Sequence, residues 1–207
     1  MSGGSFFIGS RLIPVALSLA LLPAAPVLAD DVAPDALMRR VTQEVVDSIQ
    51  RDPQIRKGDA RKAAAVIEAK VMPHFDFRRA ARLALGAQWR LASPEQQEAL
   101  VAEFRTLLVR TYSGAIASYS GQVIEYSPLR ARPGDAEVTV RSRIRQRGAP
   151  AIEVEYDMER GAEGWLVYDV RIGGISLVAN YRSAFADEVR NHGIEGLIST
   201  LASKNRG

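Results

Sequence analysis

The chain has 207 residues, and its 27 lysines and arginines nearly balance its 24 aspartates and glutamates, so the formal net charge is only +3. A charge this small argues against nucleic-acid binding, which requires a concentrated basic surface. The sequence contains no cysteine, which excludes disulfide bonds and thiolate metal sites and is compatible with a bacterial periplasmic protein. We expect no cofactor and no metal.

The N-terminal residues predict a secretory signal peptide. Arg11 precedes the apolar residues 12–22, and the small residues before Ala29 have the spacing of a cleavage site. The apolar run is shorter than the roughly 20 residues that a bilayer span needs, so a retained membrane anchor is the weaker alternative. We therefore divide the chain into a signal peptide, residues 1–29, and a single domain, residues 30–207.

Helical periodicity dominates the first half of the domain. Apolar residues recur at every fourth position from Leu37 to Ile49, which predicts an amphipathic helix that Asp52-Pro53 ends. Ser93 begins the clearest helix, because proline follows it and Gln96 completes a capping box. Two shorter helices are expected between these, at 59–72 after the cap Asp59 and at 77–85 between the cap Asp76 and Gly86. The long helix ends at 120–121, and its apolar face carries Leu100, Phe104, Leu108, Tyr112, Ile116 and Tyr119.

Alternation with a period of two predicts strands in the second half. They are expected at 123–132, 137–146, 152–159 and 166–172, with Pro128 placing the first at an edge or bulge. Matching opposite charges puts Arg141 opposite Asp157, and matching apolar residues puts Tyr156 opposite Tyr168. One sheet face is then apolar and includes Val140, Ile144, Val154, Tyr156, Tyr168, Val170 and Ile172. The other face alternates arginines with carboxylates.

A double glycine at 173–174 separates the last strand from a helix that begins near Leu177. Apolar residues at every fourth position through Val189 predict that this helix lies back against the sheet and closes one side of a concave apolar surface. A short terminal helix is expected at 194–201. The fold class is therefore α+β, with helices packed on a twisted antiparallel sheet.

Some sequence features resemble catalytic or metal sites, and each has a simpler interpretation. Residues 174–178 resemble a nucleophile elbow, but the final glycine is replaced, so Ser176 is better explained as a helix cap. His74 has no second imidazole nearby in the sequence that could share a metal. Asp157 and Asp169 project from strands, as do the bases of some small cone-shaped enzymes. The register places both on the charged face, where neighbouring arginines favour the ionised acid and leave it a weak base.

Three stretches carry a family resemblance: FDFRRAARLALGAQWR at 75–90, SPEQQEALVAEFRTLLVRTYSGA at 93–115 and WLVYDVRIGGISLVANYRSAF at 165–185. Together they resemble the MlaC family of periplasmic phospholipid carriers, also called toluene-tolerance proteins. The resemblance implies a fold like nuclear transport factor 2, with a pocket for acyl chains. It also implies a shuttle between an outer-membrane lipoprotein with its porin and an inner-membrane ABC transporter with an Mce-domain subunit. A related subgroup is associated with hopanoid lipids, and these stretches do not separate the two.

A lipid carrier must hide acyl chains from water. Transferring about 30 methylenes at about 0.8 kcal/mol each costs about 24 kcal/mol, so the lining must be apolar and free of buried charge. The residues expected to contact lipid are Phe104, Leu108, Tyr112, Ile116, Val140, Ile144, Val154, Tyr156, Tyr168 and Val170.

Exposed arginines are the candidates for docking to partner complexes. They are Arg132, Arg143 and Arg147, and we expect the carrier to be a monomer. Two other classes stay open. A cone-fold isomerase or hydrolase would require an acid inside the pocket, and a periplasmic adaptor would have a filled core.

Overall fold

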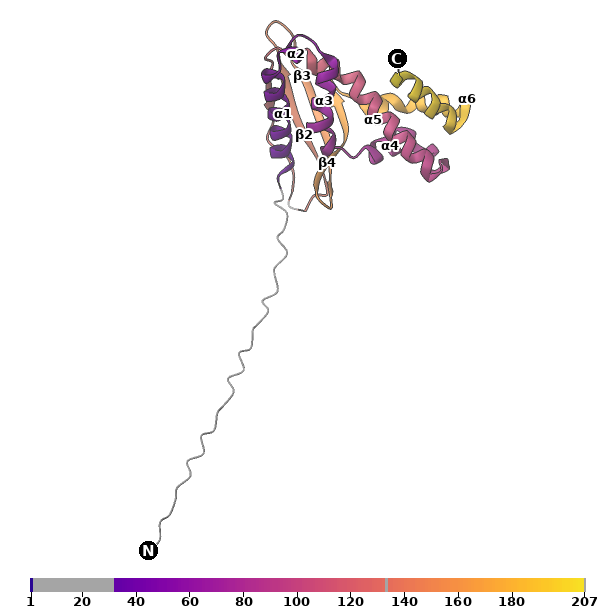
Figure 1. Ribbon diagram of the computed structural model, residues 1–207, viewed down its shortest axis with the longest axis horizontal. Coiled ribbons are helices and arrows are strands. Elements are labelled where there is room, and N and C mark those ends of the chain that lie inside the picture. Colours follow the sequence, from indigo (N-terminus) through magenta and orange to yellow (C-terminus); the bar gives the residue numbers. More distant parts are fainter. Residues whose placement is uncertain (2–31, 133, 207) are drawn as a thin grey trace.

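The computed structural model describes residue 1, residues 32–132 and residues 134–206, so the expected signal peptide lies outside the described residues except for Met1. The elements, in chain order, are α1 (Pro34–Arg51), α2 (Pro53–Arg56), α3 (Ala60–Lys70), η1 (Met72–His74), α4 (Phe77–Leu85), η2 (Gly86–Leu91), α5 (Pro94–Ala117), β1 (Val123–Tyr126), β2 (Glu137–Arg145), β3 (Ile152–Gly161), β4 (Gly164–Ile172), β5 (Ile175–Ser176) and α6 (Leu177–Arg206). The strands form one antiparallel sheet in the order β1-β2-β3-β4-β5. Figure 1 labels its strands β2, β3 and β4. This arrangement confirms the α+β class.

The predicted capping residues begin their helices. The carboxylate of Asp59 accepts hydrogen bonds from the backbone of Arg61 and Lys62, both at 3.0 Å. Asp76 accepts from the backbone N–H of Arg79 at 2.7 Å, and Ser93 forms the expected capping box at the start of α5. Each cap satisfies a backbone donor that has no partner within the helix, which is why local sequence locates these helix starts well.

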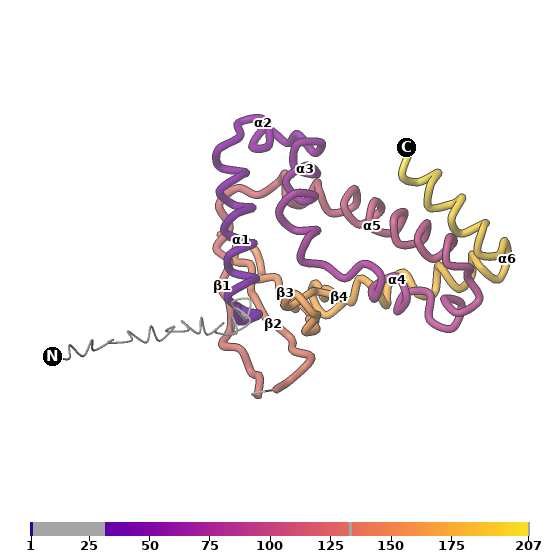
Figure 2. The backbone as a smooth tube through the Cα atoms, turned by 60° about the horizontal axis from the view of Figure 1, so that its bottom comes forward, coloured from indigo at the N-terminus to yellow at the C-terminus, as the bar shows by residue number. Residues whose placement is uncertain are grey.

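The described residues form two larger apolar cores and two smaller clusters. On one side, Leu37, Met38 and Val41 of α1 pack against the apolar face of the sheet. On the other side, α4, α5 and α6 form a helical bundle that extends away from the sheet (Figure 2). α5 links the helical core to one of the smaller clusters, because Phe104 in its first half lies in the helical core and Ala117 at its end packs with residues of α1, α2 and α3. Within the described ranges, no helix combines the length and the apolarity that crossing a bilayer needs.

The pairing of β2 with β3 differs from the predicted register by two residues. Arg141 lies opposite Glu155 and not opposite Asp157, and Arg143 lies opposite Glu153. A shift of two leaves every side chain on its predicted face, since strand side chains alternate with that period. Charge matching could not detect the error because the charges repeat with the same period, and the 146–151 turn decides the register instead.

The predicted pairing of β3 with β4 is also wrong, and here a β-bulge intervenes. Tyr168 is the extra residue of the bulge and has no partner in the β3–β4 register, so Tyr156 lies opposite Val170. The extra residue changes which side chains face the core: even-numbered residues face it after the bulge, and odd-numbered residues face it before the bulge. Trp165 and Val167, expected on the charged face, are therefore buried in the sheet core, and Tyr168 is turned to the charged face.

The C-terminal helix does not lie back on the sheet as expected. Its first residue, Leu177, reaches the sheet core, whereas Val178, Phe185 and Leu197 pack in the helical core with α4 and α5. Gly193 interrupts α6 with a φ of 71°, in the left-handed region that glycine tolerates, at the position where the sequence predicts a break. β5 was not expected and extends the sheet by two residues before the helix begins.

Candidate functional site

A cavity of about 500 Å³ lies between α1, the sheet and the end of α5. Its volume falls within the roughly 300–1,000 Å³ typical of ligand sites. Among the described residues, those that line it include no charged side chain. They are Met38, Val41, Thr42, Val45, Val46, Ile49, Val71, Phe75, Ala115, Ile116, Ser118, Tyr119, Gln122, Ile124, Ile144, Gln146, Ala149, Pro150, Ile152 and Tyr156.

The cavity has a buried end and an exposed end. The α1 residues Met38, Val41 and Val45 are buried, as the apolar stripe of that helix requires. At the turn between β2 and β3, by contrast, Pro150 is exposed and Ile152 is 47% exposed. An elongated apolar molecule can therefore enter at this turn and extend beneath α1.

The polar side chains in the wall are the hydroxyls of Thr42, Ser118, Tyr119 and Tyr156 and the amides of Gln122 and Gln146. Tyr126 is not among the lining residues, but it contacts Thr42. Thr42 Oγ1 lies 2.5 Å from the hydroxyl of Tyr126, which donates to the carbonyl of Met38 at 3.0 Å. Burial raises the pKa of Tyr126, with a further contribution from neighbouring Tyr156, and burial likewise raises the pKa of Tyr156. Both phenols therefore stay neutral at physiological pH, and the wall can contact an apolar ligand without burying a charge.

Three residues that the sequence predicts to contact lipid line this cavity: Ile116, Ile144 and Tyr156. Val140, Val154 and Val170 are buried in the sheet core that supports it. The structure places Phe104, Leu108 and Tyr112 elsewhere. Phe104 is fully buried among the bundle helices, with its ring centroid 5.3 Å from those of Tyr181 and Phe185. Leu108 packs against the helical core, and Tyr112 is half-buried.

Tyr168, the remaining residue of that set, lies on the opposite face of the sheet. The guanidinium of Arg79 sits 3.7 Å from the centroid of its ring, and its hydroxyl donates to Glu137 Oε2 at 3.4 Å. Tyr168 is therefore part of the contact between α4 and the charged face, and it is absent from the described cavity lining.

Comparisons with known proteins agree with this architecture. A sequence profile of the family described as MlaC protein matches residues 39–203. The chain belongs to the MlaC family. Toluene tolerance protein ttg2D of Pseudomonas putida is 28% identical over 104 residues, which cover 50% of this chain and 48% of that protein, so the match spans about half of that relative.

A solved structure is similar over a longer range. The phospholipid-binding protein from Ralstonia solanacearum, determined in complex with a phospholipid, is 35% identical and superposes with a TM-score of 0.77. The similarity covers 83% of this chain and 96% of that protein. The α+β architecture is therefore that of a solved phospholipid complex.

In this member of the MlaC family, sequence reasoning missed most of the cavity lining. The largest share of it comes from α1, including Val41, Val45, Val46 and Ile49. The apolar stripe of α1 was visible in the sequence, but a stripe that fills a core and one that lines a cavity have the same periodicity. Side-chain size offers a weak signal, since α1 presents the valines Val41, Val45 and Val46 to the cavity, whereas α5 presents the larger Leu100 and Phe104 to the bundle.

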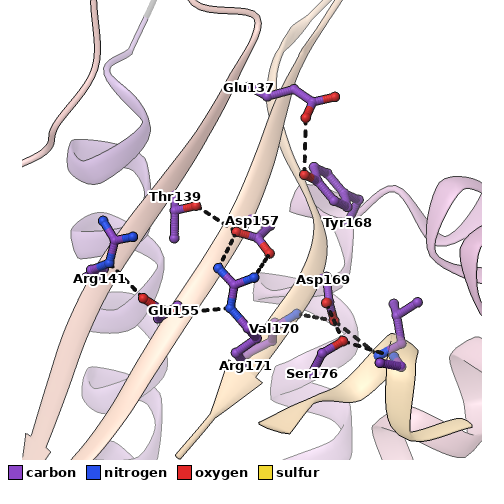
Figure 3. Close-up of polar contacts among 12 residues, drawn as sticks. Glu137, Thr139, Arg141, Glu155, Asp157, Tyr168, Asp169, Val170, Arg171 and Ser176 are labelled. Carbon is purple, nitrogen blue, oxygen red and sulfur yellow. Dashed lines mark hydrogen bonds and ion pairs between the residues drawn. The ribbon is translucent and has the colours of Figure 1, made fainter. Parts of the chain in front are cut away.

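The carboxylates of the charged face are fully engaged with other groups (Figure 3). Asp157 accepts from Thr139 at 2.7 Å and from Arg171 at 2.9 Å. Hydrogen bonds from Arg171 and Arg141 lower the pKa of Glu155, and the bond from Arg171 has the larger effect. These side chains are absent from the described lining of the cavity. The described residues also include no cluster of three histidines or acids that could hold a metal ion.

The three arginines expected to dock partners do not form one surface. Arg143 Nε donates to Glu153 Oε1 at 2.6 Å on the charged face. Arg147 is exposed in the turn beside the open end of the cavity, and Arg132 lies in the loop before β2, at the opposite end of that strand. Of the three, Arg147 is the one placed next to the cavity entrance.

Proposed function

We propose that this protein is a periplasmic phospholipid carrier that encloses acyl chains in the cavity beneath α1. The observation that carries the proposal is the uncharged apolar cavity, open at the turn between β2 and β3, in a chain 35% identical to a protein solved with a phospholipid bound. Each methylene that the cavity covers removes a transfer cost of about 0.8 kcal/mol. A lipid in this cavity keeps its polar group near water at the open end.

Native mass spectrometry tests this function directly. Protein secreted into the periplasm and purified without added lipid is expected to carry a phospholipid-sized adduct. An adduct of hopanoid mass would assign the protein to the alternative lipid class. Repeated recovery of the bare chain, from preparations whose folding is verified by circular dichroism, would contradict the carrier proposal and favour an adaptor.

The proposed transport route connects an outer-membrane lipoprotein and porin complex with an inner-membrane ABC transporter that carries an Mce-domain subunit. Its support is membership of the MlaC family, and docking then depends on exposed charge. We expect the charge reversals Arg143→Glu and Arg147→Glu together to reduce lipid transfer to vesicles bearing the transporter. If the double variant loses transfer but keeps its melting temperature, the arginines act in docking. If the variant is less stable, Arg143 serves only to stabilise the sheet through its contact with Glu153.

A further inference from the structure

The open end of the cavity is bordered by exposed apolar side chains. Ile152 in the cavity wall is 47% exposed, and Val123, the first residue of β1, is 57% exposed. Gln122 Nε2 donates to Gln146 Oε1 at 3.4 Å, which joins the start of β1 to the turn between β2 and β3. Val123 and Ile152 therefore lie at the same end of the sheet. Exposed aliphatic groups beside an opening are typical of a surface that contacts a membrane or another protein.

The short helix α2 lies at this end as well. Ile55 of α2 packs in one apolar cluster with Ile49 and Tyr119, and the latter two also line the cavity. Figure 1 shows α2 at the end of the sheet where the loop between β2 and β3 lies. The segment from the end of α1 to the start of α3 is therefore a neighbour of the cavity opening.

Positive charge is concentrated in this segment. Residues 51–62 contain five lysines and arginines and only two carboxylates. Both carboxylates are already bound, because Asp52 accepts from Lys62 Nζ at 2.9 Å and Asp59 caps α3. Among the described residues, the exposed cations at this end of the molecule that form no ion pair are Arg56, Lys57, Arg61 and Arg147. They leave an uncompensated positive surface next to the opening.

The charged face of the sheet does not share this property. Arg141, Arg143 and Arg145 are exposed too, but each pairs with a glutamate of a neighbouring strand. Unpaired cations attract an anionic surface more strongly than cations that a carboxylate already neutralises. An anionic partner is therefore expected to meet the molecule at the cavity opening.

We propose that this end of the molecule binds the surface of an anionic lipid bilayer. We call it the mouth surface; it consists of Arg56, Lys57, Arg61, Val123, Arg147 and Ile152. A bilayer presents phosphate groups above acyl chains, so it accommodates the cations and the exposed aliphatic groups together. The inference rests on the proposed function and adds the bilayer itself as a docking partner. With the mouth surface on the bilayer, acyl chains pass between membrane and cavity with little exposure to water.

Binding to vesicles that contain no protein tests the proposal. The protein, as purified from the periplasm, is sedimented with vesicles of phosphatidylglycerol and phosphatidylethanolamine, or with vesicles of phosphatidylcholine alone. We expect binding to the first and not to the second, and we expect added salt to weaken it because exposed charges are screened. Binding only to vesicles that bear the transporter complex would assign the mouth surface to a protein partner and overturn the inference.

Charge removal locates the contact. The triple variant Arg56→Gln, Lys57→Gln and Arg61→Gln is expected to bind anionic vesicles roughly 100-fold more weakly, since each cation near such a surface contributes about fivefold. The matched control removes the same charge elsewhere, from exposed positions in the helical bundle and in the loop before β2: Arg90→Gln, Arg130→Gln and Lys204→Gln. Screening should hold the loss in the control below about threefold. Equal losses would show that net charge alone governs binding, which overturns the inference.

A fluorescent label determines the orientation on the bilayer. The chain has no cysteine, so Ala151→Cys can be labelled with bimane at a single position in the turn between β2 and β3. Ala162→Cys is the matched control, at an exposed position in the turn at the other end of β3. Phospholipids brominated on their acyl chains are expected to quench the label at position 151 and not at 162. Equal quenching, or quenching at 162 alone, would refute the proposed orientation.

Failure of this inference can be distinguished from failure of the proposed function. Wild-type protein that carries lipid but binds no anionic vesicle would overturn the inference and leave the carrier proposal intact, because the adduct in native mass spectrometry does not depend on docking. A chain that purifies bare and still binds vesicles through the mouth surface would contradict the carrier proposal alone.

Discussion

The hydroxyl of Ser176 donates a hydrogen bond to the carboxylate of Asp169 at 2.5 Å and accepts one from the backbone N–H of Ala179 at 2.9 Å. Asp169 also accepts from the backbone of Val178 at 3.1 Å (Figure 3). One pair of side chains thus fixes both the end of β4 and the start of α6. The serine that resembles a nucleophile in the sequence is a helix cap.

Removing this cap should destabilise the corner. We expect Ser176→Ala to lower the free energy of unfolding by about 1 kcal/mol, the usual cost of losing an N-cap serine. Urea denaturation followed by circular dichroism measures the effect. Ser183→Ala, at an exposed position on the same helix, should change stability by less than about 0.5 kcal/mol. Equal effects of the two substitutions would contradict the capping role.

Substitutions in the cavity and in the helical core should distinguish lipid binding from fold stability. Ile144→Trp places an indole in the cavity wall and is expected to remove most co-purifying lipid without unfolding the protein. Phe104→Ala is expected to cost about 3–5 kcal/mol of stability and to leave lipid bound to the folded fraction, because Phe104 packs in the bundle. Native mass spectrometry with thermal denaturation measures both. Selective lipid loss in a stable Phe104→Ala protein would favour the lining predicted from the sequence.

Arg79 ties α4 to the charged face of the sheet. Its side chain is 16% exposed and forms ion pairs with Glu137 and Glu159, in addition to its contact with the Tyr168 ring. We expect Arg79→Met to cost about 2 kcal/mol, because Glu159 would be left half-buried without this partner. Arg78→Met, which removes an exposed pair with Glu98, should cost less than about 1 kcal/mol in the same denaturation assay. A larger loss from Arg78→Met would refute this role.

The arginines around Glu155 predict how stability depends on pH. They lower its folded-state pKa below the ordinary value of 4.5, so the unfolded chain binds the proton more readily. The stabilisation is therefore complete above about pH 4.5 and is lost as pH falls through the folded pKa. Glu155→Gln should flatten the acid limb of the stability profile measured by urea denaturation. Glu153→Gln is the exposed control on the same strand, and an equal flattening there would contradict the assignment.

Local sequence determined the parts of the fold that depend on neighbouring residues. Asp59, Asp76 and Ser93 mark helix starts because each cap binds a backbone N–H two or three positions away. The division of the sheet into an apolar and a charged face also followed from alternation, except where the bulge at Tyr168 reverses the phase. A bulge leaves no periodic signal until the two strands are paired.

Tertiary structure alone decided the register and the place of the cavity. Two registers that differ by two residues bury the same faces and match the same charges, so Arg141 could be assigned to Asp157 or to Glu155 with equal merit. A cavity is the space that packed layers leave between them, and its wall joins α1 residues such as Val45 to Ile144, about a hundred positions later in the chain. Apolar periodicity shows that a residue faces inward, and only the packing of distant elements determines whether it meets another side chain or open space.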